Sequence, residues 1–186
     1  MKHKLLACLA MGIFFFNSCK EDTAVPVELN ETSDYSADVA IKWINLQRNL
    51  VKSTSGFTPP VAARAYGYAG LALYESVVAG IRTNKSYKGL IQEFDGKGLP
   101  EIEIGKNYDW ELSANAAMAS ILRNLFKTTS SANLSAIDQL EQEVKDQSAT
   151  TDPEVIQRSI DFGKGVAEAI YTYSKLDNQD EAYLNN

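Results

Sequence analysis

The sequence predicts an all-α domain of about five helices, and three observations lead to this fold class. Apolar side chains recur at the three- and four-residue spacing of a helix in five separate segments. Residues typical of helix starts, such as a capping hydroxyl or carboxylate or a proline in the first turn, precede these segments. The one stretch that alternates like a strand, at 102–104, is too short to indicate a sheet.

The first two helices are predicted over residues 38–52 and 58–81. Ser36 is the expected cap of the first, and Thr58 caps the second, with Pro59 at the first helical position, where a missing N–H costs nothing. The second helix also contains small residues at spacings of three and four, which let another backbone approach closely. These are Ala62, Ala65, Ala69, Ala72, Ser76 and Gly80.

Three more helices are predicted over residues 109–126, 133–145 and 151–173. Asp109 is the expected cap of the first of these. The next carries only a narrow apolar stripe and is expected on the surface. The last has a broad apolar face, which indicates a buried helix, and its Gly163 is expected at a close contact between helices.

A long connection, residues 82–108, joins the second and third helices and is rich in glycine, lysine and acidic residues. Connections of this length inside a domain are often functional or partly structured, and we expect one of the two here.

Residues 1–18 are predicted to be the signal peptide of an exported lipoprotein. Two lysines precede an uncharged apolar run at 5–16, and this run is shorter than the ~20 residues that a membrane-spanning helix needs. A small residue directly before Cys19 is typical of a bacterial lipidation site, so Cys19 is expected to carry the lipid. The alternative is ordinary cleavage nearby, which leaves Cys19 as a free thiol.

Residues 19–35 are polar, acidic and aperiodic, and they are predicted to be a flexible tether to a helical domain over 36–186. No later run is long and apolar enough to span a bilayer, so membrane contact is expected through the lipid alone. The expected location is the cell envelope, at the outer membrane.

The charge balance argues against nucleic acid as a partner. Removal of the signal peptide lowers Lys+Arg from 18 to 16 against 24 acidic residues, so the net charge becomes −8. An acidic chain without a basic cluster is repelled by phosphate backbones.

The sequence offers no catalytic residue and no metal ligand set. His3 is the only histidine and lies in the signal peptide, which excludes catalytic triads and histidine bases from the mature chain. One remaining cysteine disfavours a zinc site. A hydrolase that uses two carboxylates would need no histidine, but no particular acid pair is marked among the 24 acids.

Arg64 and Glu75 are the charged residues of the otherwise apolar second helix, three turns apart on nearly the same face. Charges in apolar surroundings need compensation, so we expect each to find partners on neighbouring helices and to fix the packing. The alternative is that this polar pair lines a ligand channel.

Three blocks of the sequence carry a family resemblance. TPPVAARAYGYAGLALYESVVAGI, YDWELSANAAMASILRNLF and SIDFGKGVAEAIYTYSKLD together resemble the N-terminal helical region of bacterial vanadium-dependent haloperoxidase-like proteins. These belong to the superfamily shared with type 2 phosphatidic acid phosphatases. The likeness spans roughly residues 38–184, and the lipoprotein start is similar to versions from Bacteroidota-type envelopes.

The resemblance implies that the chain is the N-terminal part of a helical-bundle haloperoxidase-like fold. In that family a histidine binds vanadate or a substrate phosphate, with a lysine, two arginines and a Ser-Gly-His run, for halide oxidation by peroxide or phosphate ester hydrolysis. All of these residues belong to the C-terminal half of the family pattern, so none is carried over. The chain is therefore expected to be a fragment that lacks the catalytic half, and to be inactive alone.

Two functions follow as hypotheses. In the first, the chain is the helical domain of such an enzyme, and its exposed helix faces pack against a downstream catalytic domain or a second copy; vanadate is implied only for the full-length family. In the second, it is a non-catalytic envelope lipoprotein with a scaffolding or binding role. The sequence does not distinguish haloperoxidase from phosphatase.

Overall fold

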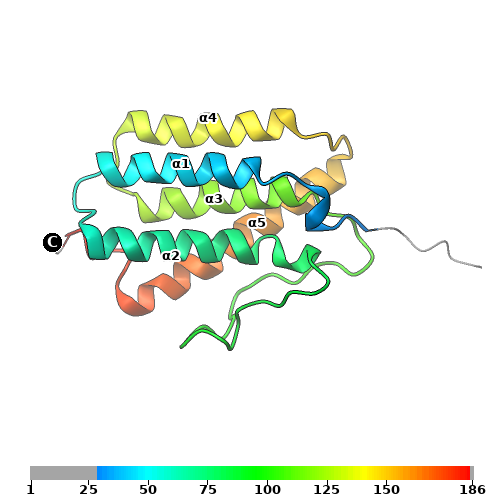
Figure 1. Cartoon of the computed structure of the whole chain (residues 1–186), viewed down its shortest axis with the longest axis horizontal. Helices are drawn as coiled ribbons and strands as arrows, with labels where there is room; N and C mark the ends of the chain where they lie inside the picture. The colour runs from blue at the N-terminus through cyan, green and yellow to red at the C-terminus, as the bar shows by residue number, and fades with distance from the viewer. Residues whose placement is uncertain (1–28, 185–186) are drawn as a thin grey trace, which may run out of the picture.

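The computed structural model describes residues 29–184, and within this range the chain forms five α-helices and no strand (Figure 1). The predicted signal peptide, Cys19 and the first part of the predicted tether lie outside the described residues. The helices are α1 (Asp38–Ser53), α2 (Pro59–Glu75), α3 (Trp110–Leu125), α4 (Ser131–Gln147) and α5 (Pro153–Ser174). The all-α prediction is therefore confirmed.

Helix α3 is the centre of the domain. Twelve of its sixteen residues are buried, and it packs against all four other helices. Figure 1 shows α1 and α2 running in opposite directions on one side of α3, with α4 beside α1. Four alanines within α3 keep the helix thin enough for neighbours on every side. From the sequence we expect α5 to be the buried helix. In the structure α5 buries one broad face, whereas α3 has other helices on all sides.

Most of the predicted helix starts are confirmed. The Asp109 carboxylate accepts a hydrogen bond from the Leu112 N–H at 2.9 Å, and the Asp152 carboxylate accepts one from the Glu154 N–H at 2.9 Å. Thr58 is extended before Pro59, as a cap should be. The Ser36 hydroxyl accepts a hydrogen bond from the first helical N–H of α1, at Asp38, although Ala37 is the boundary residue.

The second helix is shorter than predicted. It ends at Glu75, and the chain continues through a 3₁₀ turn at Val78–Gly80. A Cβ at Gly80 would lie 2.3 Å from the Trp110 indole ring, so the backbone here passes directly against that ring. The prediction that this helix continues to residue 81 is therefore wrong, because the contact of Gly80 with the Trp110 ring turns the chain off the helix axis.

Residues 29–35, which we expect from sequence to be part of a flexible tether, instead pack on the domain. The Trp110 indole N–H donates to the Asn30 carbonyl at 2.9 Å, and the Thr32 hydroxyl donates to the Val77 carbonyl at 2.6 Å. The Tyr35 hydroxyl donates to the Tyr108 carbonyl at 3.2 Å. These contacts place the start of the domain before residue 36.

The long connection over residues 82–108 is a series of turns that attaches itself through aromatic side chains. Phe94 and Tyr108 are each 3% exposed and belong to the core. No strand forms at 102–104, where Ile104 is almost fully exposed. The connection is thus partly structured, which was one of the two outcomes expected for it.

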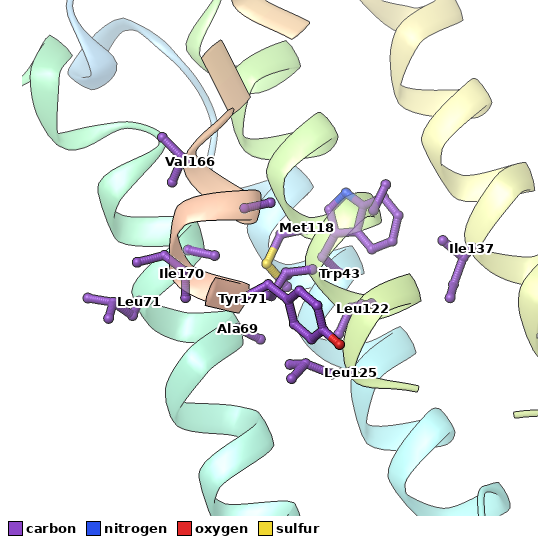
Figure 2. Close-up of a cluster of buried hydrophobic side chains, with 14 of the residues drawn as sticks. Trp43, Ala69, Leu71, Met118, Leu122, Leu125, Ile137, Val166, Ile170 and Tyr171 are labelled. Atoms are coloured by element: carbon purple, nitrogen blue, oxygen red, sulfur yellow. The ribbon is translucent and has the colours of Figure 1, made fainter. Parts of the chain in front are cut away.

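The hydrophobic core lies around α3 and is drawn in Figure 2. Met118, Leu122 and Leu125 of α3 face Trp43 of α1 and Ile170 of α5 across the core. The surface position predicted for α4 is confirmed, because only Ile137 and Val144 of that helix are buried. The six small residues singled out in α2 and the turn after it are all buried as well.

Helices α5 and α3 approach each other closely at Gly163. A Cβ added there would stand 2.1 Å from the Ser113 carbonyl oxygen and 3.1 Å from the Ala117 nitrogen. The obstacle is backbone, which cannot rotate away as a side chain can. Gly163 therefore sets the distance between α5 and α3, as the sequence predicts.

We predict opposite effects for the same substitution at two helical glycines. Gly163→Ala should lower the free energy of unfolding by about 3 kcal/mol, at the upper part of the range for overpacked cores. Gly67→Ala, where nothing lies within 4 Å of the added methyl, should raise it by about 0.5–1 kcal/mol, because glycine is a poor helix former. Urea unfolding of both variants measures the difference, and equal effects would contradict the packing described here.

Candidate functional site

Arg64 and Glu75 do not contact each other and serve separate attachments. The Arg64 guanidinium donates to the Asp177 carbonyl at 3.1 Å and lies 3.6 Å from the Asp177 carboxylate, just beyond α5. The Glu75 carboxylate, 4% exposed, accepts a hydrogen bond from the Tyr87 N–H at 2.7 Å. Arg64 thus binds α2 to the end of α5, and Glu75 holds the long connection against the end of α2.

An apolar groove lies between α1 and α2, with α3 as its floor. Its volume is about 400 Å³. Its walls include Ala37, just before α1, and Ala40 of α1, together with Gly70, Leu73 and Tyr74 of α2; Ala114 of α3 lies at its base. We refer to this opening as the α1–α2 groove. It exists because α1 and α2 each pack on α3 but touch each other only sparsely.

The surface beside the groove is apolar over about two turns of α1. Ile41 and Ile44 are 53% and 44% exposed and share a helix face with Ala37 and Ala40, and the next residue on that face is the exposed Arg48. On α2, Ala63, Gly67 and Gly70 are exposed at helical spacing. A surface helix normally presents charged residues to solvent, so two exposed isoleucines on one face of α1 are unusual.

No packing contact within residues 29–184 requires glycine at the two exposed glycine positions of α2. Nothing lies within 4 Å of a Cβ built at Gly67 or Gly70. Each costs about 1 kcal/mol of helix stability relative to alanine. Such positions suit the close approach of another backbone, which would lie along the α1–α2 groove.

One end of the groove is acidic. Glu111 is the only residue with a formal charge among the described residues that line it. Burial, reinforced by the neighbouring carboxylates of Asp109 and Asp38, raises the pKa of Glu111. Lys42, the nearby cation, is held at 2.7 Å by Glu143 of α4. This end of the groove therefore has unbalanced negative charge.

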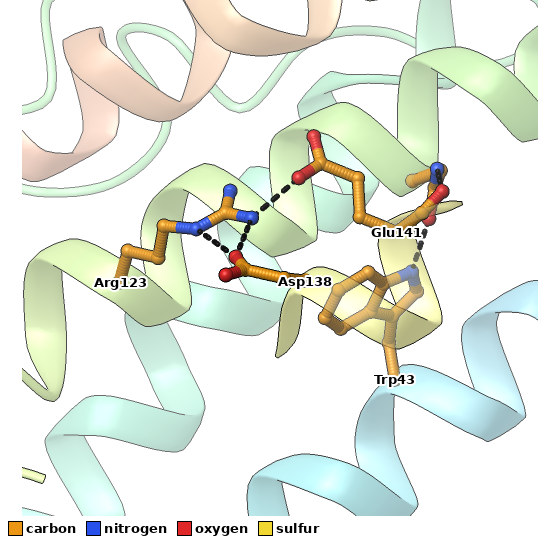
Figure 3. Close-up of polar contacts among 5 residues, drawn as sticks. Trp43, Arg123, Asp138 and Glu141 are labelled. Carbon is orange, nitrogen blue, oxygen red and sulfur yellow. Dashed lines mark hydrogen bonds and ion pairs between the residues drawn. The ribbon is translucent and has the colours of Figure 1, made fainter. Parts of the chain in front are cut away.

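Polar contacts hold α1 and α4 on α3, the floor of the groove. The Trp43 indole N–H of α1 donates to the Asn115 side-chain oxygen of α3 at 2.9 Å, and the Asn115 amide donates to the Glu141 carbonyl of α4 at 2.9 Å (Figure 3). Arg123 of α3 joins Asp138 and Glu141 on α4, also seen in Figure 3. These links hold α1 and α4 in register on α3.

Asp109 fixes the start of α3. Its carboxylate, in a residue that is 2% exposed, accepts hydrogen bonds from the Leu112 N–H, the Ser148 hydroxyl at 2.8 Å and the Thr150 hydroxyl at 2.6 Å. Its own N–H donates to the Ser159 hydroxyl at 2.8 Å. The Asp109 side chain thus joins the start of α3 to the α4–α5 loop, and its backbone N–H joins it to α5.

Residues 29–184 contain neither a cluster of metal-ligating side chains nor a helix able to span a membrane. No three histidine, cysteine, aspartate or glutamate side chains lie where they could share a metal ion. None of the described helices combines the length and apolar character needed to cross a bilayer.

The α1–α2 groove was missed by the sequence reasoning above, although a signal was present. Alanine and glycine at 63, 67 and 70 follow one face of the second helix, opposite the buried small residues. Small residues on two opposite faces of a helix indicate a packing partner on each face. The sequence prediction used only the buried face.

Comparisons of the chain with protein-family models, with curated proteins and with solved structures found no match.

We predict that Glu111→Gln stabilises the protein at neutral pH. Because the folded-state pKa is raised, Glu111 holds its proton more tightly when folded, so the stability that it contributes is present below the unfolded pKa and is lost as pH rises through the folded pKa. The variant should melt above the wild type at pH 7, and the difference should vanish below about pH 4. Glu154→Gln, in the exposed first turn of α5, is the control and should show no such gain.

Asp109→Ala should lower the free energy of unfolding by about 2–4 kcal/mol, since it removes a helix cap and leaves the half-buried Ser148 and Thr150 hydroxyl groups without their acceptor. Asp152→Ala removes the corresponding cap of α5 in an exposed setting and should cost about 1 kcal/mol. Chemical denaturation of both variants provides the comparison. A loss at Asp109 no greater than at Asp152 would show that the buried network contributes little.

Proposed function

We propose that this chain is the N-terminal helical domain of a vanadium-dependent haloperoxidase- or phosphatase-like envelope lipoprotein. Its role in that enzyme is to pack against a catalytic domain. The largely apolar α1–α2 groove, with its single charged lining residue at Glu111, is the observation that carries this proposal, because it offers a surface on which another helix could pack.

The three resembling blocks support the proposal. They fall on residues 58–81, 108–126 and 159–177, which contain α2, α3 and all but the first six residues of α5. These three helices pack on one another, so the resemblance lies on one connected unit of the fold. It is also the unit that forms the floor and one wall of the groove.

The groove suits one kind of occupant, an amphipathic helix with a basic residue near one end. Its walls demand an apolar face, and Gly67 and Gly70 allow the helix backbone to lie close to α2. The acidic end, at Glu111 and Asp38, would pair with a lysine or arginine of that helix. The proposed occupant belongs to the catalytic domain.

Vanadate does not fit the residues described here. The family resemblance assigns the bond to vanadate to a histidine, and residues 29–184 contain none. The chain's own contribution is therefore structural: it orients and covers the catalytic domain. The proposed site of action is the cell envelope, where lipid on Cys19 would hold the protein at the outer membrane.

The vanadate claim has a direct test. Vanadium-51 NMR of the purified chain should show only free vanadate. The DNA beyond codon 186, read in the same frame, should encode the lysine, arginine and Ser-Gly-His pattern, and the longer product should bind vanadate in a saturable manner. Saturable binding by this chain alone would overturn the proposal, and a stop codon at that point would favour the non-catalytic scaffolding role.

A second copy of the chain is the competing occupant of the groove. The soluble form without the lipid should be monomeric at micromolar concentration in sedimentation velocity, because the groove is shaped for a basic helix and this chain is acidic. If it is instead a dimer that Gly67→Arg dissociates while Gln142→Arg, on the exposed side of α4, does not, the groove is an interface between copies.

A further inference from the structure

A second groove lies between residues 93–98 of the long connection and the last two turns of α5. Its volume is about 470 Å³. Phe94, Ala169, Tyr173 and Leu176 supply its apolar surface. We refer to it as the α5 groove. It shares no lining residue with the α1–α2 groove.

The aromatic side chains of the α5 groove are held in place. The Tyr173 ring centroid lies 5.0 Å from that of Phe94 and 5.7 Å from that of Tyr68. The Tyr173 hydroxyl donates to the Gln92 carbonyl at 2.8 Å, which fixes the ring against the long connection. Leu176, at 62% exposure, remains open to solvent beside it.

The charges around the α5 groove are mostly negative, and the Asp95 carboxylate accepts a hydrogen bond from the Lys97 N–H at 2.8 Å. Glu93, Asp95 and Glu168 line it together with one cation, Lys97. None of these four side chains forms an ion pair with another residue in the described range. Burial raises the pKa of the Tyr173 hydroxyl, and the nearby Asp177 and Glu93 carboxylates raise it further, as expected in a negative field.

We propose that the α5 groove binds a small organic cation with an apolar body, such as a quaternary ammonium ion. The half-buried Tyr173 ring, held from behind by the buried Phe94, can attract a cation over its face, and carboxylates at the rim add to this attraction. The volume lies within the range of small-molecule sites. Fixed rings lose little freedom on binding, which favours a small ligand.

This inference goes beyond the proposed function and does not depend on it. Neither the α1–α2 groove, nor a catalytic domain, nor vanadate contributes to the α5 groove. Binding of an organic cation can therefore fail or succeed whatever the DNA beyond codon 186 encodes.

The test is a calorimetric titration of the purified full chain with benzyltrimethylammonium. Benzyl alcohol is the neutral control, and phenylmethanesulfonate has a similar shape with the opposite charge. The cation should bind in a saturable manner and at least about five-fold more tightly than the alcohol, and the sulfonate should not bind. Equal binding of cation and alcohol, or no binding of the cation, would overturn the proposal.

Variants place the binding in the groove. Glu168→Gln, on the outer face of α5, should weaken the cation about three-fold and leave benzyl alcohol unchanged. Glu154→Gln, on the same helix but away from the groove, should have no effect. If a lysine- and leucine-rich peptide binds here while benzyltrimethylammonium does not, the groove is a protein-docking site and the proposal is wrong.

Discussion

The distance between α3 and α5 is the constraint on which the rest of the domain depends. Gly163 lets the α5 backbone lie against the Ser113 carbonyl, at a separation that no side chain would allow. The Ser113 hydroxyl in turn donates to the Ser76 carbonyl at 2.7 Å, which joins α3 to the end of α2. Helix α3 can be surrounded because such contacts need only small residues, and the large side chains of the core fill the space at its other faces.

The α1–α2 groove is a consequence of this central helix. Because α1 and α2 both pack their apolar faces against α3, they make few contacts with each other. Their outer edges carry isoleucine, alanine and glycine where an isolated domain would place charge. The domain thus has a well-packed core but leaves an apolar surface exposed along α1 and α2. This arrangement is expected of a domain that packs against another.

Much of the fold could be predicted from the sequence. Helix number, the cap at Asp109 and the close contact at Gly163 all follow from local residue patterns. The sequence could not place the central helix, since the apolar stripe of α3 does not reveal that the small and polar residues on its other faces are buried as well. The end of α2 also escaped prediction, because it depends on contact between Gly80 and Trp110. The partners of Arg64 and Glu75 lie in segments 12 or more residues away and outside the helices predicted to hold them.

The central claim is that another protein surface covers the α1–α2 groove. The most direct measurement compares the labelling of an engineered cysteine at Gly67, where the structure leaves open space, in the native cell envelope and in the purified chain. Gln142→Cys on the exposed side of α4 is the control. If the account is right, the thiol at position 67 reacts at least about ten-fold more slowly in the envelope than in the purified chain, while the thiol at position 142 reacts equally in both. Equal reactivity at position 67 in both settings would show an uncovered groove and contradict the account.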